Sequence, residues 1–386
     1  MMQQKRSFPI GTLILTIVAL VSVPVMIIRF LNGLGAISNL SDGRAWGLWI
    51  SFDLYCGVAL AAGGFTLAAL VHIFNAERYH PVVRPAILTA FLGYIIVILA
   101  LLVDLGQPWY IWHIMINWNI HSPLFEVGWC VMLYTGVLAL EMSPALFERL
   151  NWKVPLRIIG MIQIPLIIAG IVISTGHQNS LGSMLLLLPY TLDPLWYTPI
   201  LPALFFVSAV AVGPAMVILE STLSGMAFGH RVSRDVLSGL GRLIPYALGI
   251  YLVMKIVDVA VAGELDMIVN SYPQNVYWLV EVVVGVVLPI ILLSIPKVRE
   301  NRASLFGAAL LVVGGLILNR FNVSLLWQTI RPGYTYFPSW MEFAVSAGVV
   351  AWAIIVFMLA IRLLPIEQHH DEAETPGQHI SEVAAS

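Results

Sequence analysis

The chain has 386 residues, of which 59% are hydrophobic and 10% charged, and its mean hydropathy is +0.90. Soluble domains carry about a quarter charged residues, so this composition excludes a soluble globular fold and predicts an all-α, polytopic membrane protein. The net charge of -2 offers no basic surface for nucleic acid, and the two cysteines, Cys56 and Cys130, lack the clustered spacing of an iron–sulfur or structural zinc site.

Apolar runs of about 20 residues, the length that crosses a bilayer core, recur along the whole chain. We predict ten membrane spans, at 10–30, 48–75, 84–105, 123–147, 154–176, 198–224, 239–262, 276–296, 303–321 and 340–364. We expect one membrane domain, 1–365, and a disordered cytoplasmic tail, 366–386. Within the domain we expect a four-helix bundle at 48–176, a pseudo-repeat of it at 198–321, and two flanking helices.

The pseudo-repeat is based on two short matches. Asp104 and Glu126 are 22 residues apart, and Asp258 and Glu281 are 23 apart, with LFEV around the first glutamate and LVEV around the second. Matches this short also arise by chance.

Basic residues are distributed unevenly between the two sets of loops. Fourteen Lys and Arg fall in one set with the two termini, and four fall in the other. The positive-inside rule therefore predicts that both termini are cytoplasmic. Two of the outer segments, 106–122 and 177–197, are long and aromatic and carry no Lys or Arg. They are typical of interfacial anchors or of a surface for a docked partner, and we favour the partner.

Four consecutive spans each contribute one protonatable residue that we expect near the outer face: Asp53, Asp104, Glu126 and His177, the last expected at the end of its helix. An ionisable group inside a membrane indicates a functional site, although helix-end residues and helix–helix hydrogen bonds give the same pattern. With no Lys or Arg in the outer halves of these spans, we expect a ring of uncompensated carboxylates beside a histidine, which suits proton-coupled chemistry.

A second charged group lies on later spans and consists of Lys255, Asp258, Glu281 and Arg320. Here opposite charges are present, and we favour a structural network in which Lys255 pairs with Asp258 or Glu281, and Arg320 pairs with a carboxylate. A proton path is the alternative.

The inner halves of the spans carry four further polar residues: His72, Tyr94, Glu141 and Glu220. They form either a proton relay or helix ends facing headgroups. Only His72 and His177 lie in or at spans, and they lie at opposite faces, so we predict that the chain binds no haem. We interpret Gly63 and Gly64 as a close helix contact.

Several motifs together resemble the NrfD/PsrC family, and within it the ten-helix HybB-like branch, the membrane subunit of group-2 type hydrogenases. They include VDLGQPWY, HSPLFEV, LALEMSPALFERLNWKV, TGHQNSLGSM and YTYFPSWMEF. The resemblance implies a quinone-binding anchor, for menaquinone or ubiquinone, in a prokaryotic cytoplasmic membrane. It implies an extracytoplasmic four-cluster ferredoxin-like iron–sulfur partner, with further hydrogenase or multihaem cytochrome c subunits. The chain is then a subunit of an oxidoreductase complex that does not hold the catalytic centre and has no iron–sulfur cluster of its own.

With the quinone placed in the 48–176 bundle, the residues expected to bind it are His177, Asp53, Asp104, Glu126, Gln178, Ser180 and Trp49. The expected proton path consists of Glu141, His72, Tyr94, Lys255, Asp258 and Glu281. A secondary transporter and a purely proton-conducting module are the alternative functions.

Overall fold

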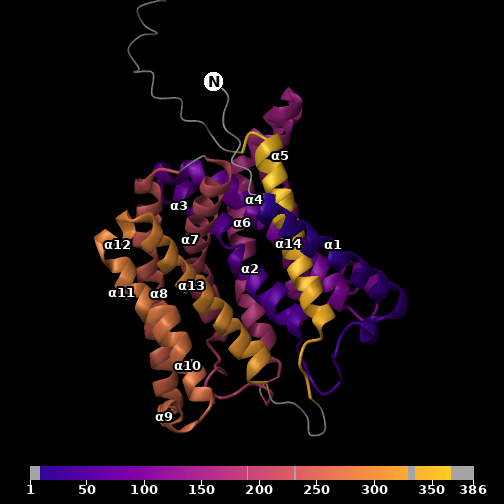
Figure 1. Ribbon diagram of the computed structural model, residues 1–386, viewed down its shortest axis with the longest axis vertical. Helices are drawn as coiled ribbons and strands as arrows, with labels where there is room; N and C mark the ends of the chain where they lie inside the picture. The colour runs from indigo at the N-terminus through magenta and orange to yellow at the C-terminus, as the bar shows by residue number, and fades with distance from the viewer. Residues whose placement is uncertain (1–8, 189, 230–231, 329–334, 367–386) are drawn as a thin grey trace, which may run out of the picture.

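The computed structural model describes residues 9–188, 190–229, 232–328 and 335–366, and every regular element in these ranges is helical (Figure 1). Ten helical segments are long and apolar enough to cross a membrane, which confirms the ten predicted spans. The predicted tail beyond Ile366 lies outside the described residues, as do four basic residues of the charge comparison: Lys5, Arg6, Arg231 and Arg331.

Six spans are single α-helices: α1 (Pro9–Asn32), α5 (Pro123–Leu150), α6 (Lys153–Leu186), α7 (Leu201–Phe228), α8 (Arg234–Ala262) and α14 (Trp340–Leu363). The third span joins η3 (Glu77–Val82) to α4 (Val83–Asp104). The second, eighth and ninth spans are composite: η2 (Trp49–Cys56), α2 (Gly57–Leu60) and α3 (Gly63–His72); α10 (Gln274–Val282), η5 (Val283–Val287) and α11 (Leu288–Ser294); and α13 (Arg302–Phe321) with η6 (Asn322–Leu326). Four short helices lie between spans: η1 (Leu34–Ala36), η4 (Pro108–Met115), α9 (Met267–Asn270) and α12 (Pro296–Glu300).

The three composite spans share a π-helical segment, η2, η5 or η6. A π-turn widens the helix by one residue and is common at functional sites. Here buried polar residues lie in or beside these segments: Asp53 in η2, Glu281 just before η5, and Asn322 in η6.

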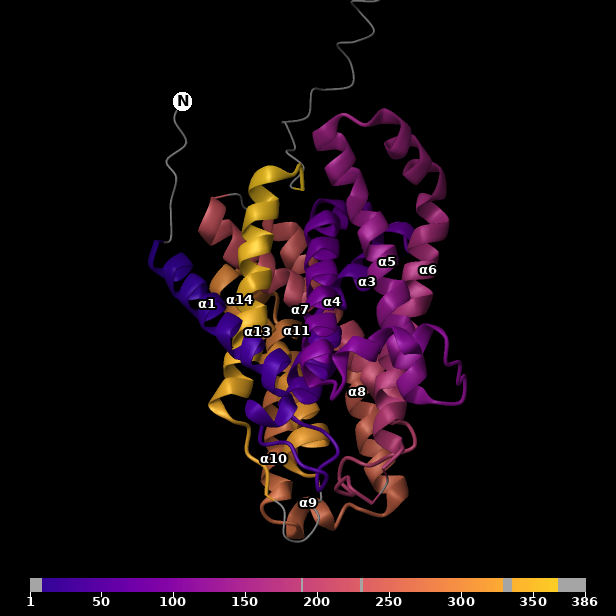
Figure 2. The ribbon, with the colours of Figure 1, turned by 90° about the vertical axis from the view of Figure 1, so that its right-hand side faces the viewer.

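The two ends of the described chain lie at the same end of the molecule. Figure 2 shows the beginning of α1, the end of α14 and the α5–α6 connection toward this end, and α9 at the opposite one. We call these the terminal end and the α9 end. On the predicted topology, the α9 end is the outer one.

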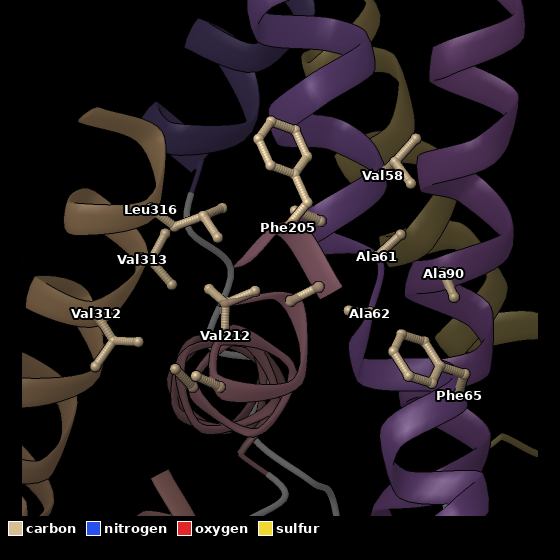
Figure 3. Packing of buried hydrophobic residues seen from close by; sticks show 14 of the residues in the cluster. Val58, Ala61, Ala62, Phe65, Ala90, Phe205, Val212, Val312, Val313 and Leu316 are labelled. Carbon is tan, nitrogen blue, oxygen red and sulfur yellow. The ribbon is translucent and has the colours of Figure 1, made fainter. Parts of the chain in front are cut away.

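Helix α7 lies at the centre of the packing. It contacts α2, α3 and α6 on one side and α8 and α13 on the other. Figure 3 shows Phe205 and Val212 of α7 between Val58 and Ala62 of the second span and Leu316 of α13. Helices α1 and α14 pair on one flank, where α14 also contacts α4 and η2 (Figure 1). Because α6 and α3 contact α7 directly, the division into two separate four-helix bundles stays a prediction.

The fifth span is longer than predicted, because α6 continues ten residues beyond 176 to Leu186. The polar run after Thr175 does not end the helix, since its side chains bond carbonyls one turn back. Asn179 Nδ2 donates to the Thr175 carbonyl at 3.0 Å, Ser180 Oγ to Gly176 at 2.8 Å, and Ser183 Oγ to Asn179 at 3.1 Å. These bonds satisfy the polar side chains inside the helix, so the expectation that His177 ends its helix was wrong.

Glycines allow the closest helix contacts. A Cβ on Gly63 would lie 3.3 Å from the Gly213 carbonyl, and a Cβ on Gly64 would lie 2.8 Å from Ala90 Cβ, which confirms the predicted packing role of this pair. Among the described glycines, the closest approach to backbone joins Gly285 and Gly315, where a Cβ on Gly315 would lie 2.3 Å from the Gly285 Cα.

Replacing Gly315 by alanine should therefore destabilise the protein, because backbone cannot move aside as a side chain can. Overpacking of this kind costs about 1–3 kcal/mol, and we expect thermal unfolding of the purified protein to occur several degrees lower.

Gly314→Ala is the matched control, since a Cβ there meets nothing within 4 Å. Equal unfolding temperatures for the two variants would contradict the close crossing.

Candidate functional site

His177 lies deep in the protein, nine residues before the end of α6, and its side chain is 0% exposed. Its Nδ1 is 2.8 Å from the hydroxyl oxygen of Tyr94 on α4. Its Nε2 is buried and has no hydrogen-bond partner among the described residues. A buried polar atom without a partner is unfavourable by about 1–3 kcal/mol, so this nitrogen is suited to a ligand or a water molecule.

The Tyr94 side chain continues a row of polar groups. Tyr134 of α5 packs edge-on against it, with ring centroids 4.7 Å apart, and Ser174 of α6 lies near both tyrosine hydroxyls. Glu141, two turns further along α5, interacts electrostatically with Tyr134. Glu141, Tyr134, Tyr94 and His177 thus form a row of exchangeable protons running from the terminal end toward the middle of the bundle.

Gln178 lies beside His177 and is also fully buried. Its Nε2 donates to the carbonyl of Val58 in α2 at 3.1 Å, while its Oε1 has no partner among the described residues. Ser180, predicted to bind the same ligand, donates instead to the Gly176 carbonyl of its own helix. The structure therefore brings Gln178 to His177 and turns the Ser180 hydroxyl elsewhere.

Asp53 lies in η2, closer to the α9 end, and is buried. Ser346 Oγ of α14 donates to its Oδ2 at 2.6 Å, and its Oδ1 has no partner in the described part of the chain. Trp49, one turn earlier, is 1% exposed and its Nε1 is likewise without a partner. The Trp49 ring packs in a cluster with Val25 and Val103, so it faces α1 and α4 and not His177.

Asp104, at the end of α4, is compensated by an arginine. Arg29 of α1 is 2% exposed, donates through Nε to the Val103 carbonyl at 2.7 Å and through Nη2 to the Leu105 carbonyl, and interacts electrostatically with Asp104. Arg29 on the first span therefore compensates Asp104 in part, and the expectation of uncompensated carboxylates did not include this cation.

The four residues of the expected ring do not share one level. His177 meets Tyr94, which precedes Asp104 by ten residues on α4, so the histidine lies about 15 Å deeper than Asp104. Glu126, in the first turn of α5, is exposed. Asp53 and Asp104 are close enough to interact electrostatically, and they form an outer pair distinct from the inner site at His177.

The residues expected to form the inner proton path also lie in different places. Tyr94 belongs to the inner site. His72, at the end of α3, is exposed and lines a hollow of about 490 Å³ with Arg78 and His80 at the terminal end. Glu220 of α7 accepts a hydrogen bond of 2.7 Å from Thr89 of α4 and lies apart from the tyrosine row.

Glu281 is the centre of the second charged group. Lys255 Nζ donates to its Oε1, which confirms that predicted ion pair, and Asn319 Nδ2 donates to the same oxygen at 2.9 Å. Asn322 Nδ2 and Trp196 Nε1 each donate to Oε2 at 2.8 Å. Four donors from four segments hold one buried carboxylate, which is the arrangement of a structural network.

Among the residues that the structure describes, Arg320 bonds no carboxylate directly, contrary to expectation. Its guanidinium donates to Asn319 Oδ1 at 2.6 Å and to Ser208 Oγ at 2.8 Å, and its Cζ lies 3.5 Å from the Phe205 ring centroid. Asn319 thus bridges Arg320 and Glu281. Asp258, the alternative partner predicted for Lys255, accepts instead from Thr198 at 2.5 Å.

The two glutamates that the proposed repeat aligns differ in burial. Glu126 is exposed, whereas Glu281, its counterpart in the repeat, is 1% exposed and fully bonded. The local matches LFEV and LVEV therefore predicted helix position but not burial.

The sequence analysis did not predict one of the buried carboxylates. Glu342, in the first turn of α14, accepts from the backbone N–H groups of Asn39 at 2.9 Å and Ser339 at 3.0 Å and from the Tyr336 hydroxyl at 2.5 Å. Burial and the Glu342 carboxylate raise the pKa of Tyr336, which lies outside the spans. Ser339 and Glu342 form a capping box, and the spacing Ser-x-x-Glu before an apolar run was the signal available for it.

These features define a polytopic membrane protein that keeps partnerless polar atoms inside its spans, beside a row of tyrosines and a carboxyl group. Residues 37–330 match the family described as "Polysulphide reductase, NrfD", and the chain belongs to that family, as its motifs predicted.

Curated relatives extend the similarity to nearly the whole chain. The "Probable Ni/Fe-hydrogenase 2 b-type cytochrome subunit" of Escherichia coli is 35% identical over 343 residues, covering 88% of this chain and 87% of the relative. The "Menaquinone reductase, integral membrane subunit" of Nitratidesulfovibrio vulgaris is 33% identical over 363 residues, covering 87% and 86%. The chain is thus similar to membrane subunits of hydrogenase and quinone reductase complexes, in agreement with the predicted HybB-like branch.

The Glu281 network predicts a large effect of Lys255→Met. The substitution leaves a buried carboxylate without its counter-charge, and breaking a buried pair in this way costs about 3–5 kcal/mol. We expect a sharply reduced yield of monodisperse protein in gel filtration and a lower unfolding temperature.

Adding Glu281→Gln to Lys255→Met should restore much of the loss, because the amide is neutral. Asp258→Asn, one turn away and half-buried, is the control and should have little effect. A stable Lys255→Met single variant would show that the pair is not structural.

Proposed function

We propose that the chain is the quinone-interacting membrane subunit of a respiratory oxidoreductase complex, and that it passes electrons between the quinone pool and an iron–sulfur partner. The single observation that carries this proposal is the inner site, where His177 Nε2 and Gln178 Oε1 are both fully buried and lack partners in the part of the chain that the structure describes. The relatives named as a menaquinone reductase subunit and a hydrogenase subunit support the same assignment.

The hydrogen-bonding groups of the inner site suit the head group of a quinone. If the Tyr94 hydroxyl donates to Nδ1, neutral His177 carries its proton on Nε2 and presents a donor, while Gln178 Oε1 presents an acceptor. A quinone carbonyl accepts from the first, and a quinol hydroxyl donates to the second. The apolar side chains around the site suit the isoprenoid tail. When bound, the quinone supplies the two-electron, two-proton chemistry.

Proton exchange is assigned to two routes from this site. Toward the terminal end, Tyr134 and Glu141 continue the row that begins at His177 and Tyr94. Toward the α9 end, Asp53 is the favoured group, because one of its oxygens is open and Asp104 is compensated by Arg29. The exposed Glu126, the turned-away Ser180 hydroxyl and the Trp49 ring have weaker support as quinone ligands.

The α9 end also carries the proposed partner surface. The segment η4 and the residues after it expose large aromatic side chains: Trp109 is 69%, Trp112 47% and Trp118 64% exposed. We assign this surface to the extracytoplasmic four-cluster iron–sulfur subunit, with the protein in the cytoplasmic membrane and both termini on the cytoplasmic side. Hydrogenase or multihaem cytochrome c subunits would complete the complex.

A secondary transporter and a proton-conducting module are the competing functions. Transporter sites are built on broken helices near the midplane, whereas the helices that carry His177 and Tyr94, α6 and α4, are continuous. Co-purification of quinone and an iron–sulfur protein supports the anchor. A chain that moves a solute without either would overturn it.

We further propose that this chain binds no haem, although one relative is named a b-type cytochrome subunit. Gln178 bonds Val58, and His72 follows Val58 by 14 residues, so the two span histidines lie roughly 20 Å apart in depth. The chain purified without partners should therefore lack a Soret band. A stoichiometric haem spectrum would overturn this.

His177→Ala should slow quinone turnover by the assembled complex about tenfold to a hundredfold, the range for loss of a ligand hydrogen bond of about 1–3 kcal/mol. Tyr94→Phe keeps the ring and removes the hydroxyl that fixes the tautomer, so we expect a smaller loss. The measurement is quinone-linked turnover, with an artificial electron carrier as the readout of the partner's own activity.

The artificial-carrier rate should stay normal in both variants, and Ser180→Ala is the control on the same helix. If His177→Ala assembles and exchanges electrons with quinone at the normal rate, the quinone site lies elsewhere.

A further inference from the structure

A basic hollow opens at the terminal end, where the seventh, eighth and ninth spans begin or end. Its volume is about 450 Å³, and it is lined by Arg234, Lys297, Glu300, Asn301, Arg302 and Ala303. Three cations from three segments, α8, α12 and α13, thus face one carboxylate. The quinone proposal makes no use of this site, which is at the end of the protein opposite to the partner surface.

Two of the cations are available to a ligand. Arg234 and Lys297 are exposed, and neither has an ion-pair partner among the described residues. Arg302 is fixed, since its Nη2 donates to the Val232 carbonyl at 2.6 Å. The net positive charge of the lining favours an anion.

The hollow lies at the boundary of the membrane. The eighth span ends at Ser294 and the ninth begins at Arg302, with the short helix α12 between them, and the seventh begins at Arg234. On the membrane side, Ile291 is 55% and Ile295 42% exposed. The hollow therefore lies at the ends of three candidate spans, and exposed apolar side chains precede its Lys297 along the chain.

We propose that this hollow binds the phosphate headgroup of an anionic phospholipid, with the acyl chains lying along the surface of Ile291 and Ile295. Basic sites between span ends are suited to such headgroups, because phosphate gains charge-assisted hydrogen bonds while the chains stay in the bilayer. A free phosphate would use the cations alone and leave the apolar border without a role.

The test measures binding of phosphatidylglycerol to the detergent-solubilised protein by native mass spectrometry, with phosphatidylcholine as the neutral lipid. Each basic residue near an anionic lipid contributes roughly fivefold, so Arg234→Gln with Lys297→Gln should weaken phosphatidylglycerol binding by about 25-fold. Phosphatidylcholine binding should not change.

The matched control is Lys153→Gln with Arg157→Gln, which removes the same charge from exposed positions at the start of α6, also at the terminal end. If both double variants weaken phosphatidylglycerol binding equally, the effect comes from general electrostatic attraction, and the proposed site would be overturned. Competition by inorganic phosphate at the concentration of the lipid would overturn the lipid as ligand. If the double variant does not fold, Lys297→Gln alone should still give the roughly fivefold loss, and normal binding by it would overturn the proposal.

Discussion

Polar groups inside the membrane have no bulk water to bond, and this constraint separates the buried polar residues into two kinds. Around Glu281, donors from other segments occupy both carboxylate oxygens, and Asn319 links this carboxylate to Arg320. Few atoms of that network remain open, chiefly Arg320 Nε and Asn322 Oδ1. Around His177 the atoms without a partner among the described residues are the ring Nε2 and the Oε1 of the neighbouring Gln178. A carboxylate with both oxygens hydrogen-bonded to other segments holds helices together, whereas a buried imidazole with one unbonded nitrogen is suited to a ligand.

The closed network depends on backbone contact between two spans. Gly285 follows Glu281 by one turn, and Gly315 precedes Asn319 by one turn, so the antiparallel crossing at the two glycines brings Glu281 against Asn319. Helix α7 connects this network to the other half of the protein. Arg320 bonds Ser208 and packs on Phe205, both on α7, and α7 also contacts α2, α3 and α6. Small residues thus determine the distance at which charged ones meet.

Depth separates the chemical roles that we propose for the buried polar groups. The outer pair of Asp53 and Asp104 lies near the aromatic surface of η4, the His177 site lies about 15 Å deeper, and the row through Tyr94 and Tyr134 leads toward Glu141 and the terminal end. A quinone at the inner site would meet protons from either end and electrons from the α9 end. The basic hollow at Arg234 and Lys297 would anchor the terminal end of the second half to lipid.

The sequence by itself determined the number of spans, their approximate limits and the family, because hydrophobic length and local motifs are properties of the chain alone. It also pointed to His177, Asp53 and the Lys255–Glu281 pair, since ionisable residues are rare in spans and stand out in any arrangement. Only the tertiary structure decided how deep His177 lies, that Arg29 compensates Asp104, that Glu126 is exposed, and that Asn319 stands between Arg320 and Glu281. Hydropathy fixes neither the rotation of a helix nor its neighbours. The side chains of Asn179 and Ser180 donate hydrogen bonds to carbonyls one turn back in their own helix. A polar run of this kind therefore continues a helix where composition predicts its end.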